Sequence, residues 1–437
     1  MAGEYGFVEL GEVASVRSGF AFKSSDWSNT GVPVVKIANV KDGHLVMDGC
    51  SFVDANVAAS AVDAALQPGD VLIAMTGYIG EVALVHERDL PALLNQRVGR
   101  FSVRDPYRLD QRFLFYVLRH RDVRKEIEGL GYGSAQPNVS PSLILSVGIP
   151  LPPLPEQRAI AHILGTLDDK IELNRRMSET LEAMARAIFK AWFVDFEPVR
   201  AKCRGDQPVA PTGWQWPQHI LDLFPDRLVD SELGEIPEGW GVGRLGDVAN
   251  NPRRVVRVGD IDPQAPYIAL EHMPKRCIAL SDWGTGDGLE SNKFQFRAGE
   301  ILFGKLRPYF HKVGVAPLDG VCSTDIVVVA PRTTHWFGFV LGHASSAEFV
   351  DHTDAGSTGT KMPRTNWTYM ARYELAMPPE HVAADFTDLI QPWIDRILAN
   401  IHQSRTLAAL RDTLLPKLIS GEIRVKDAEK FIGRAGA

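Results

Sequence analysis

Two glycine-containing motifs in this sequence have a residue spacing that is found in nucleotide-binding sites. Residues 299–305 (GEILFGK) have the spacing G-x-x-x-x-G-K of a phosphate-binding loop. Leu306 stands where a Ser or Thr hydroxyl would reach Mg²⁺, and the residues between the glycines include a strand-like apolar run. Residues 241–246 (GVGRLG) have the spacing G-x-G-x-x-G, but no strand is predicted before them, so we interpret them as a turn. Neither motif predicts a nucleotide site.

The sequence offers no catalytic set. It lacks the Asn/Asp-Pro-Pro-Tyr/Phe motif of amino-methyltransferases, and no group of acidic residues and lysines stands out as a nuclease centre. Its cysteines are scattered without a CxxC pair, which argues against zinc and a disulfide framework and fits a reducing cytoplasm. These cysteines are Cys50, Cys203, Cys277 and Cys322. We therefore expect no metal, no cofactor and no enzymatic activity in this chain.

Local basic and aromatic residues are the chemistry that remains. Lys and Arg neutralise phosphates, and both can pair with guanine edges in the major groove. Loops are the better candidates because small and polar neighbours let the backbone approach a ligand. The DNA-contacting candidates are Thr76, Gly77, Tyr78, Gly80, Ser134, Gln136, Asn138, Arg253, Arg254, Lys305, Arg307, Tyr309, Lys361 and Arg364.

Lys305 and Arg307 are the strongest single candidates among these residues. They follow a strand-like run and lie beside Tyr309, so a loop would present a basic fork next to an aromatic face. Arg307 could read a guanine, touch a phosphate, or bond to its own domain as a structural residue. For arginines on a predicted helix, such as Arg119 and Arg121, a solvated surface is the favoured interpretation.

A long helix is predicted over residues 155–193. Its stripe residues recur at alternating steps of four and three, the spacing of one helix face. At about 1.5 Å per residue, the stripe spans roughly 40 Å and needs a partner. The opposite face, which includes Glu182, is expected to meet water. The stripe consists of Ile160, Leu164, Leu167, Ile171, Asn174, Ser178, Leu181, Ala185 and Ile188.

The same pattern returns 226 residues later, where Asn400 repeats Asn174. A buried Asn in such a seam fixes register at a cost in stability, although both Asn could instead lie at its edge. Pro392 lies inside the second pattern and could delay or kink that helix. The second stripe consists of Phe386, Ile390, Trp393, Ile397, Asn400, Ser404, Leu407, Arg411 and Leu414.

Shorter repeats extend the duplication to the rest of the chain. Residues 245–249 echo 10–14, and residues 377–379 echo 151–153. A tandem duplication predicts an α+β fold with two mixed α/β domains separated by two long helices. A single helix is predicted over 110–128, and an irregular connector after residue 193. The predicted segments are 1–154 (domain 1), 155–193 (helix), 194–235 (connector), 236–380 (domain 2), 381–425 (helix) and 426–437 (tail).

Bulk composition limits the classes of protein that remain. The chain has 437 residues with a formal net charge of −7, so any nucleic-acid surface must be local. The N-terminal residues lack the pattern of a signal peptide, and no apolar run approaches the roughly 20 residues of a membrane span. We expect a cytoplasmic protein that does not bind membranes.

Several motifs resemble the conserved regions of one family, the specificity subunits of type I restriction-modification systems. The likeness covers nearly the whole chain, and its central motif is highly specific, whereas the two α/β domains match only in framework. The motifs are residues 150–161 (PLPPLPEQRAIA), 164–171 (LGTLDDKI), 191–198 (AWFVDFEP), 233–240 (LGEIPEGW) and 414–423 (LLPKLISGEI).

The resemblance implies a non-enzymatic DNA reader. In that family two target-recognition domains each read one half of a split site in double-stranded DNA. The two helices pair as an antiparallel coiled coil, set the gap between half-sites and dock the modification subunits. Those subunits transfer a methyl group from S-adenosylmethionine to adenine N6, and a restriction subunit translocates and cleaves DNA with ATP and Mg²⁺. A spacer of roughly 40 Å approximates one turn of B-DNA, about 34–36 Å.

Two other classes of function stay open at the level of sequence. The coiled coil could serve assembly alone, in a scaffold protein without sequence-specific DNA reading. The chain could also be an enzyme with its own methyltransferase centre, which the missing motifs disfavour. DNA binding together with modification partners distinguishes the first alternative, and methyl transfer by the single chain distinguishes the second.

Overall fold

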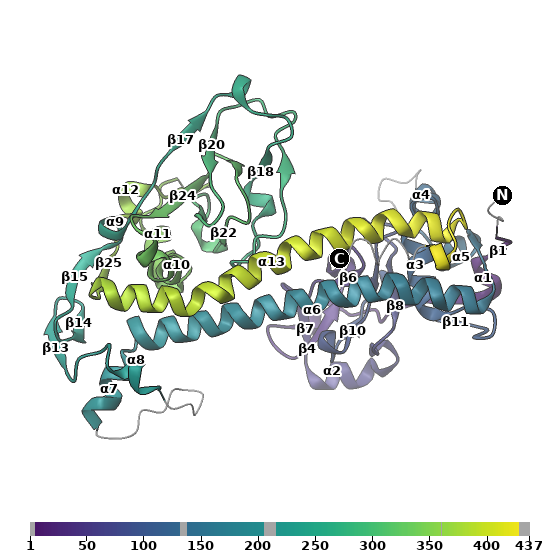
Figure 1. Cartoon of the computed structure of the whole chain (residues 1–437). Coiled ribbons are helices and arrows are strands. Elements are labelled where there is room, and N and C mark those ends of the chain that lie inside the picture. The colour runs from purple at the N-terminus through teal and green to yellow at the C-terminus, as the bar shows by residue number, and fades with distance from the viewer. Residues whose placement is uncertain (1–4, 132–137, 205–215, 360, 428–437) are drawn as a thin grey trace. The chain divides into compact units, whose positions relative to one another are not determined.

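The chain forms two compact units (Figure 1). Unit 1 comprises Met1–Lys170 together with Leu407–Ala437, and unit 2 comprises Ile171–Thr406. Two long helices, α6 (Leu154–Phe193) and α13 (Glu380–Ile419), each contribute residues to both units. The computed structural model describes residues 5–131, 138–204, 216–359 and 361–427.

Unit 1 contains two four-stranded sheets, ordered β2-β11-β8-β9 and β10-β4-β7-β3. The first sheet is antiparallel, and all four residues of β8 are buried. The strands are β1 (Phe7–Glu9), β2 (Ala14–Ser18), β3 (Trp27–Ser28), β4 (Val32–Val35), β5 (Val40–Lys41), β6 (His44–Leu45), β7 (Ser51–Val53), β8 (Val71–Ala74), β9 (Val82–Leu84), β10 (Leu93–Leu94), β11 (Val98–Val103) and β12 (Gly148–Pro150).

The prediction of one continuous helix over residues 110–128 was wrong, because this stretch forms two separate helices. His120 has an extended backbone, and its imidazole Nδ1 accepts the N–H of Asp122 at 3.4 Å. The chain therefore stops one helix and caps the next at the same residue. The helices of unit 1 outside α6 and α13 are α1 (Leu10–Val13), α2 (Ala55–Ser60), α3 (Gln111–Arg119), α4 (Arg121–Gly129) and α5 (Pro141–Leu145).

Unit 2 repeats this plan. Its sheet β16-β24-β21-β22 has the same strand order and antiparallel pairing as β2-β11-β8-β9, which confirms the duplicated α+β fold. A five-stranded sheet, β17-β20-β23-β18-β19, accompanies it. The strands are β15 (Gly241–Arg244), β16 (Ala249–Asn250), β17 (Arg254–Val256), β18 (Pro266–Ile268), β19 (Gly284–Thr285), β20 (Lys293–Phe296), β21 (Ile301–Gly304), β22 (Val313–Val315), β23 (Gly320–Cys322), β24 (Ile326–Pro331) and β25 (Glu374–Met377), and the helices are α9 (Leu245–Val248), α10 (Phe337–Ala344), α11 (Ala347–Ala355) and α12 (Trp367–Met370).

Residues 241–246 are not the turn that their glycines predict. Gly241–Arg244 forms β15, which pairs antiparallel with β25 from Gly241↔Met377 to Arg244↔Glu374. A strand is possible there because its partner lies more than a hundred residues later in the sequence, which a local pattern cannot reveal.

The connector is also more regular than predicted. Residues 197–237 contain α7 (Glu197–Arg204), α8 (Gln218–Leu221), β13 (Leu228–Ser231) and β14 (Gly234–Pro237). Val199 of α7 is fully buried, and Phe224 packs edge-on against Trp192 with ring centroids 5.2 Å apart. The burial of these side chains against α6 stabilises the short helices, whose own length is too small for that.

Within unit 1, α6 and α13 pack as the predicted antiparallel pair. Leu164, Leu167 and Leu414 are buried in one cluster with the α3 side chains. Asp168 of α6 accepts a hydrogen bond from the Arg411 guanidinium at 2.6 Å. The ion pair therefore ties the C-terminal part of α13 to the N-terminal part of α6.

Within unit 2, the seam between the same helices contains both asparagines. Asn174 and Asn400 are 1% and 4% exposed, so they lie inside the seam and not at its edge. Asn174 Nδ2 donates to Gln403 Oε1 (2.8 Å) and Ser404 Oγ (3.3 Å), while Asn400 Nδ2 donates to Ser178 Oγ (3.2 Å). The remaining predicted seam residues are buried or half-buried: Ile171, Leu181, Ile188, Ile390, Trp393, Ile397 and, in unit 1, Leu407.

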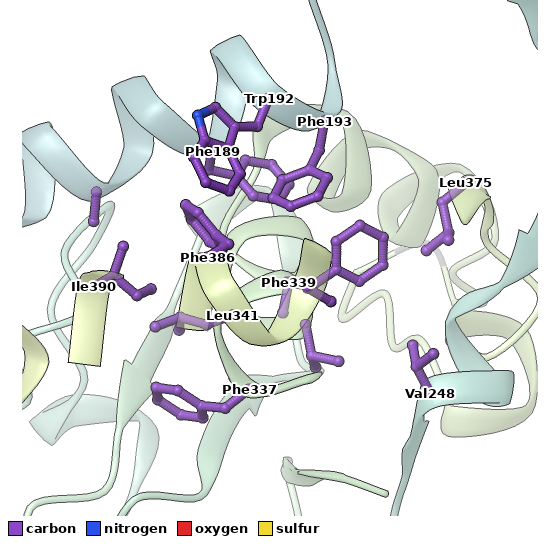
Figure 2. Close-up of a cluster of buried hydrophobic side chains, with 14 of the residues drawn as sticks. Phe189, Trp192, Phe193, Val248, Phe337, Phe339, Leu341, Leu375, Phe386 and Ile390 are labelled. Carbon is purple, nitrogen blue, oxygen red and sulfur yellow. The ribbon is translucent and has the colours of Figure 1, made fainter. Parts of the chain in front are cut away.

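An aromatic cluster closes the other end of this seam in unit 2. Figure 2 shows Phe189, Trp192 and Phe193 of α6 directed toward Phe386 of α13 and Phe339 of α10. Ring centroids of Phe193 lie 5.1 Å from Phe386 and 5.0 Å from Phe339, both edge-to-face. Edge-to-face contacts add to the burial of large apolar side chains, so this cluster fixes α10 on the helix pair.

The prediction that Glu182 faces water was wrong. Glu182 is 6% exposed, and its carboxylate accepts the Ile278 N–H at 3.0 Å, because the segment after β18 covers that helix face. Pro392 does not delay α13, which begins at Glu380 and continues past the proline. Asp388, four residues earlier, is exposed, so water can reach the carbonyl that Pro392 leaves without an N–H. The helix ends at Ile419, before residue 425, because Gly421 adopts a left-handed backbone (φ +77°).

Candidate nucleic-acid interface

In unit 1 the structure brings two of the predicted loops together. Thr76, directly after β8, forms a β-bridge with Asn138, and its hydroxyl donates to Asn138 Oδ1 at 2.7 Å. The Val139 N–H donates to the Met75 carbonyl at 2.9 Å. Ser134 and Gln136 lie outside the described residues. The exit of β8 and the segment before α5 therefore form one surface feature.

Glycines shape the first of these loops. Gly77 and Gly80 both have left-handed backbones, with φ of +73° and +84°. A Cβ at Gly80 would also lie 3.2 Å from the Glu128 side chain. Between them Tyr78 is 55% exposed, so its ring is free to stack on a ligand.

A cavity of about 320 Å³ lies beneath this loop. Arg124 lies in it between two carboxylates: its Nε donates to Glu128 at 2.8 Å, and its Nη2 donates to Glu81. The cation is therefore fully compensated, and the cavity as a whole is neutral to acidic. Its lining residues are Gly77, Tyr78, Ile79, Glu81, Arg124, Glu128 and Gly131.

Unit 2 brings the corresponding predicted loops together in the same way. Leu306, after β21, forms a β-bridge with Arg364. The Arg307 N–H donates to the Pro363 carbonyl at 2.8 Å. Arg364 is tied down by its own ion pair, because its Nε donates to Asp325 at 3.0 Å. Lys361 is exposed.

The hydrogen-bond pattern aligns the two loop pairs residue by residue. The residue that directly follows the strand is Met75 after β8 in unit 1 and Lys305 after β21 in unit 2. In each unit, the backbone N–H of this residue donates to a carbonyl of a neighbouring loop, and its own carbonyl accepts an N–H from the partner segment. The bonds are Met75 to Arg97 (3.1 Å) and Val139 to Met75 (2.9 Å) in unit 1, and Lys305 to Asp325 (2.9 Å) and Thr365 to Lys305 (3.1 Å) in unit 2. Gly77 and Arg307 thus occupy the same position, and both are left-handed.

Arg307 is therefore an arginine in a conformation that favours glycine. Its φ is +52°, its Nη2 donates to the Lys361 carbonyl at 3.3 Å, and its guanidinium lies 5.9 Å from the Phe310 ring centroid. Tyr309, next to Phe310, is 48% exposed. The loop presents an arginine and an aromatic side chain at one surface, as the sequence predicts for this stretch.

The other basic candidates of unit 2 have different surroundings. Arg254 donates to both Glu300 oxygens, at 2.9 and 2.6 Å, so its charge is compensated inside its own unit. Arg253 is exposed, with a left-handed backbone (φ +44°) and its guanidinium 5.7 Å from the Phe294 ring. Of these two arginines, only Arg253 has a charge that no carboxylate among the described residues balances.

Comparisons with known proteins agree with this geometry. Residues 3–183 match the family described as "Type I restriction modification DNA specificity domain". The chain is 27% identical over 373 residues to the type I restriction enzyme MjaIX specificity subunit of Methanocaldococcus jannaschii, covering 82% of this chain and 78% of the relative. It is 24% identical over 457 residues to the EcoBI specificity subunit of Escherichia coli, covering 95% and 89%.

The chain is similar to type I restriction-modification specificity subunits. A crystal structure of the S subunit from M. genitalium has the same fold, with a TM-score of 0.53 at 14% identity over 95% of this chain and 96% of that one. At such identity the likeness concerns the fold alone, and it says nothing about which residues of this chain could contact DNA.

Some residues beside the unit 2 loop were not predicted from the sequence. Lys275 Nζ lies 5.0 Å from the Phe310 ring centroid, and the Arg276 N–H donates to the His311 carbonyl at 2.8 Å. Both cations are exposed. In the sequence, only the adjacent pair of basic residues at 275 and 276 pointed to this surface. Their contact with Phe310 could not be predicted, because it joins segments more than thirty residues apart.

The described residues were also compared with the requirements of a metal site and of a membrane span. No group of three or more His, Cys, Asp or Glu side chains there could hold a metal ion. Within the same described ranges, no helix is both long and apolar enough to cross a bilayer.

Proposed function

We propose that the chain reads a split site in double-stranded DNA, one half-site with the loop pair of each unit. The observation that carries this proposal is the matched geometry of the two loop pairs, in which Thr76 meets Asn138 and Leu306 meets Arg364. A duplicated reader presents equivalent loops to two separate half-sites, whereas a scaffold has no need to conserve loop geometry in both copies. The scaffold alternative is accordingly not favoured.

In this proposal the helices α6 and α13 set the gap between the half-sites and dock the modification subunits. The reciprocal asparagine contacts in the seam support a fixed register, which a molecular ruler requires. Insertion of one turn into both helices, next to Arg176 and Gln403, should then change the gap while both half-site sequences stay the same.

We also propose that catalysis belongs to the partners. The modification subunits would bind S-adenosylmethionine and methylate adenine N6, and a restriction and translocation subunit would use ATP and Mg²⁺. This chain would supply sequence recognition and scaffolding, without a cofactor of its own. The complex would act in the cytoplasm, where its DNA is found.

The test uses the full chain together with its modification subunits. Methylation sequencing of cells that express the complex gives the methylated motif, and binding to duplexes with that motif and with scrambled half-sites gives the specificity. We expect a bipartite motif and a strong preference for it. Equal affinity for the motif and the scrambled duplexes would favour the scaffold function.

A further inference from the structure

The Phe310 ring in unit 2 is flanked by two cations. Lys275 Nζ lies 5.0 Å and Arg307 Cζ lies 5.9 Å from its centroid. Among the described residues, neither cation forms an ion pair with a carboxylate, in contrast to Arg254 and Arg364 nearby in the sequence. An aromatic face attracts cations, but it does not cancel the repulsion between two of them. Neither of these two cations therefore has a carboxylate partner of its own among the described residues.

Further positive charge surrounds the same ring. Arg276 is exposed beside Lys275 and hydrogen-bonds through its backbone to His311. Burial lowers the pKa of Lys312, and the neighbouring Lys275 ammonium lowers it further, against the opposing effect of the Glu271 carboxylate. Such a local excess of positive charge, in a chain whose net charge is −7, fits a surface that binds a polyanion.

The backbone around this cluster is strained. Arg276, Arg307 and His311 all have left-handed backbones, with φ of +54°, +52° and +51°. Such conformations cost energy for residues other than glycine and gather where a ligand site requires a particular side-chain direction. At the position of Arg307, unit 1 has Gly77, which meets the same backbone requirement without strain. The guanidinium is therefore retained at a cost to the fold.

One edge of the Arg307 guanidinium is already closed to a ligand. Its Nη2 donates to the Lys361 carbonyl at 3.3 Å, and its Nε is buried without a hydrogen-bond partner. The Nε–Nη2 edge therefore cannot read a guanine bidentately, whereas the N–H groups of Nη1 form no hydrogen bond among the described residues. These donors suffice for a phosphate oxygen, and Lys275 supplies a second positive charge at the same Phe310 ring.

We propose that Lys275 and Arg307 together clamp one backbone phosphate of the DNA half-site that unit 2 reads. The clamp positions the duplex and carries no sequence information itself. Among the described residues of unit 1, Gly77 stands at the position of the arginine, and the nearby Arg124 is compensated by two carboxylates. This inference rests on the proposed DNA-reading function and assigns unlike chemistry to the two half-sites.

The salt dependence of binding tests the clamp. The full chain with its modification subunits is titrated against a duplex of the methylated motif over a series of KCl concentrations, with Lys275→Ala, Arg307→Ala and the double variant. Each phosphate contact contributes about 0.9 to the slope of log affinity against log salt. If both residues hold one phosphate, each single variant lowers the slope and the double variant lowers it by no more than about 0.9.

Two further variants separate the clamp from a structural role. Arg307→Gly removes the guanidinium and relaxes the backbone, so it should bind as poorly as Arg307→Ala yet unfold at a higher temperature than that variant. Arg297→Ala is the matched control: this exposed arginine lies before β21, at the opposite end of that strand from Lys305, and its loss should leave the slope unchanged.

The alternatives give different results. A relaxed second half-site with an unchanged slope would mean that Arg307 reads a base, and an additive loss of about 1.8 would mean two separate phosphates; either result overturns the clamp. Unchanged binding by all three clamp variants overturns it as well. Failure of the DNA-reading proposal is distinguishable, because the unmodified complex would then bind motif and scrambled duplexes equally.

Discussion

Asn400 donates its side-chain N–H to the backbone carbonyl of Asn174 at 3.3 Å, inside the seam between α13 and α6. The surrounding bonds are reciprocal: Asn174 reaches Ser404 of the other helix, and Asn400 reaches Ser178. Since each residue of α13 is the duplicate of one in α6, the two copies meet as the halves of a symmetric dimer would. The seam is thus a self-complementary contact within one chain.

Replacing one asparagine alone should lower the free energy of unfolding by more than half of what replacing both asparagines costs. Asn400→Leu leaves the polar side chains of Asn174 and Ser178 facing an apolar group, so we expect a loss of about 1–2 kcal/mol in the free energy of unfolding. The double variant Asn174→Leu/Asn400→Leu makes the seam apolar and should cost less than the sum of the single changes. Urea denaturation of the four proteins measures this coupling, and strict additivity would contradict it.

Asp168 and Asp169 are neighbours with very different expected contributions to stability. Asp168 accepts bonds from Arg411 at 2.6 Å and from the Tyr116 hydroxyl at 2.7 Å, and it lies 3.6 Å from Arg119. Asp168→Ala leaves two largely buried guanidinium groups without their shared carboxylate, which should cost about 3 kcal/mol.

Asp169→Ala is the control for that change. Its carboxylate is mostly exposed and pairs with Arg112, so its loss should cost at most about 1 kcal/mol. Melting temperature and proteolysis of unit 1 report both effects. Equal destabilisation by the two variants would show that the buried network contributes nothing beyond a surface ion pair.

His343 should make stability fall in mild acid. It is enclosed by the rings of Phe189, Phe339 and Tyr373, and burial lowers its pKa from 6.5 to about 3. Between pH 6.5 and 3 the unfolded chain binds a proton at this residue that the folded chain does not. Unfolding is therefore favoured as pH falls, by up to about 1.4 kcal/mol per pH unit.

The variant His343→Leu isolates this contribution. It removes the titrating group from an apolar surrounding, so the difference in unfolding free energy between the variant and the unmodified chain should grow in favour of the variant from pH 7 to pH 5. Urea denaturation at each pH gives this difference. A difference that stays constant with pH would mean that His343 is protonated in the folded chain as well.

The cysteines should differ sharply in reactivity. Burial and the nearby Glu182 carboxylate together raise the pKa of the Cys277 thiol to about 12, whereas Cys203 is exposed. Since the thiolate is the reactive form, alkylation of Cys277 at pH 8 should be at least about a hundredfold slower than that of Cys203. Mass spectrometry over a time course checks this order, and Glu182→Gln should shift only the rate at Cys277.

The purified chain alone should neither methylate nor cleave DNA. The reason is the absence from its sequence of methyltransferase and nucleotide-binding motifs and of a metal-ligand pattern. Transfer of labelled methyl groups and nicking of a plasmid are the measurements, with the complete complex as the positive control. Activity that co-purifies with the single chain through successive columns would refute this prediction.

The duplication was visible in the sequence because the helices keep their spacing. Asn174 and Asn400 stand 226 residues apart, and the seam pattern on both sides of them is regular enough to predict two long helices. The structure also brings the candidate loops together in pairs, since Thr76 and Asn138 meet, as do Leu306 and Arg364. Their contact with DNA stays a prediction.

What escaped prediction depends on contacts between distant segments. Glu182 follows the polar pattern of its helix, yet the Ile278 backbone covers it. The match between Gly77 and Arg307 has an offset of 230 residues instead of 226, because the loops between the strands differ in length. Only the shared hydrogen bonds of Met75 and Lys305 reveal it. Helix periodicity carries no information about either relationship.

Unit 1 is formed by two segments of the chain that lie on either side of unit 2 in the sequence. This arrangement affects how unit 1 can fold during translation. Its core includes Leu414, Leu415 and Leu418, which are translated after the whole of unit 2. Unit 2, in contrast, is one continuous stretch and can finish folding earlier. The apolar face of Ile160 and Leu164 stays uncovered until these leucines emerge from the ribosome, so this half of the nascent protein depends most on chaperones.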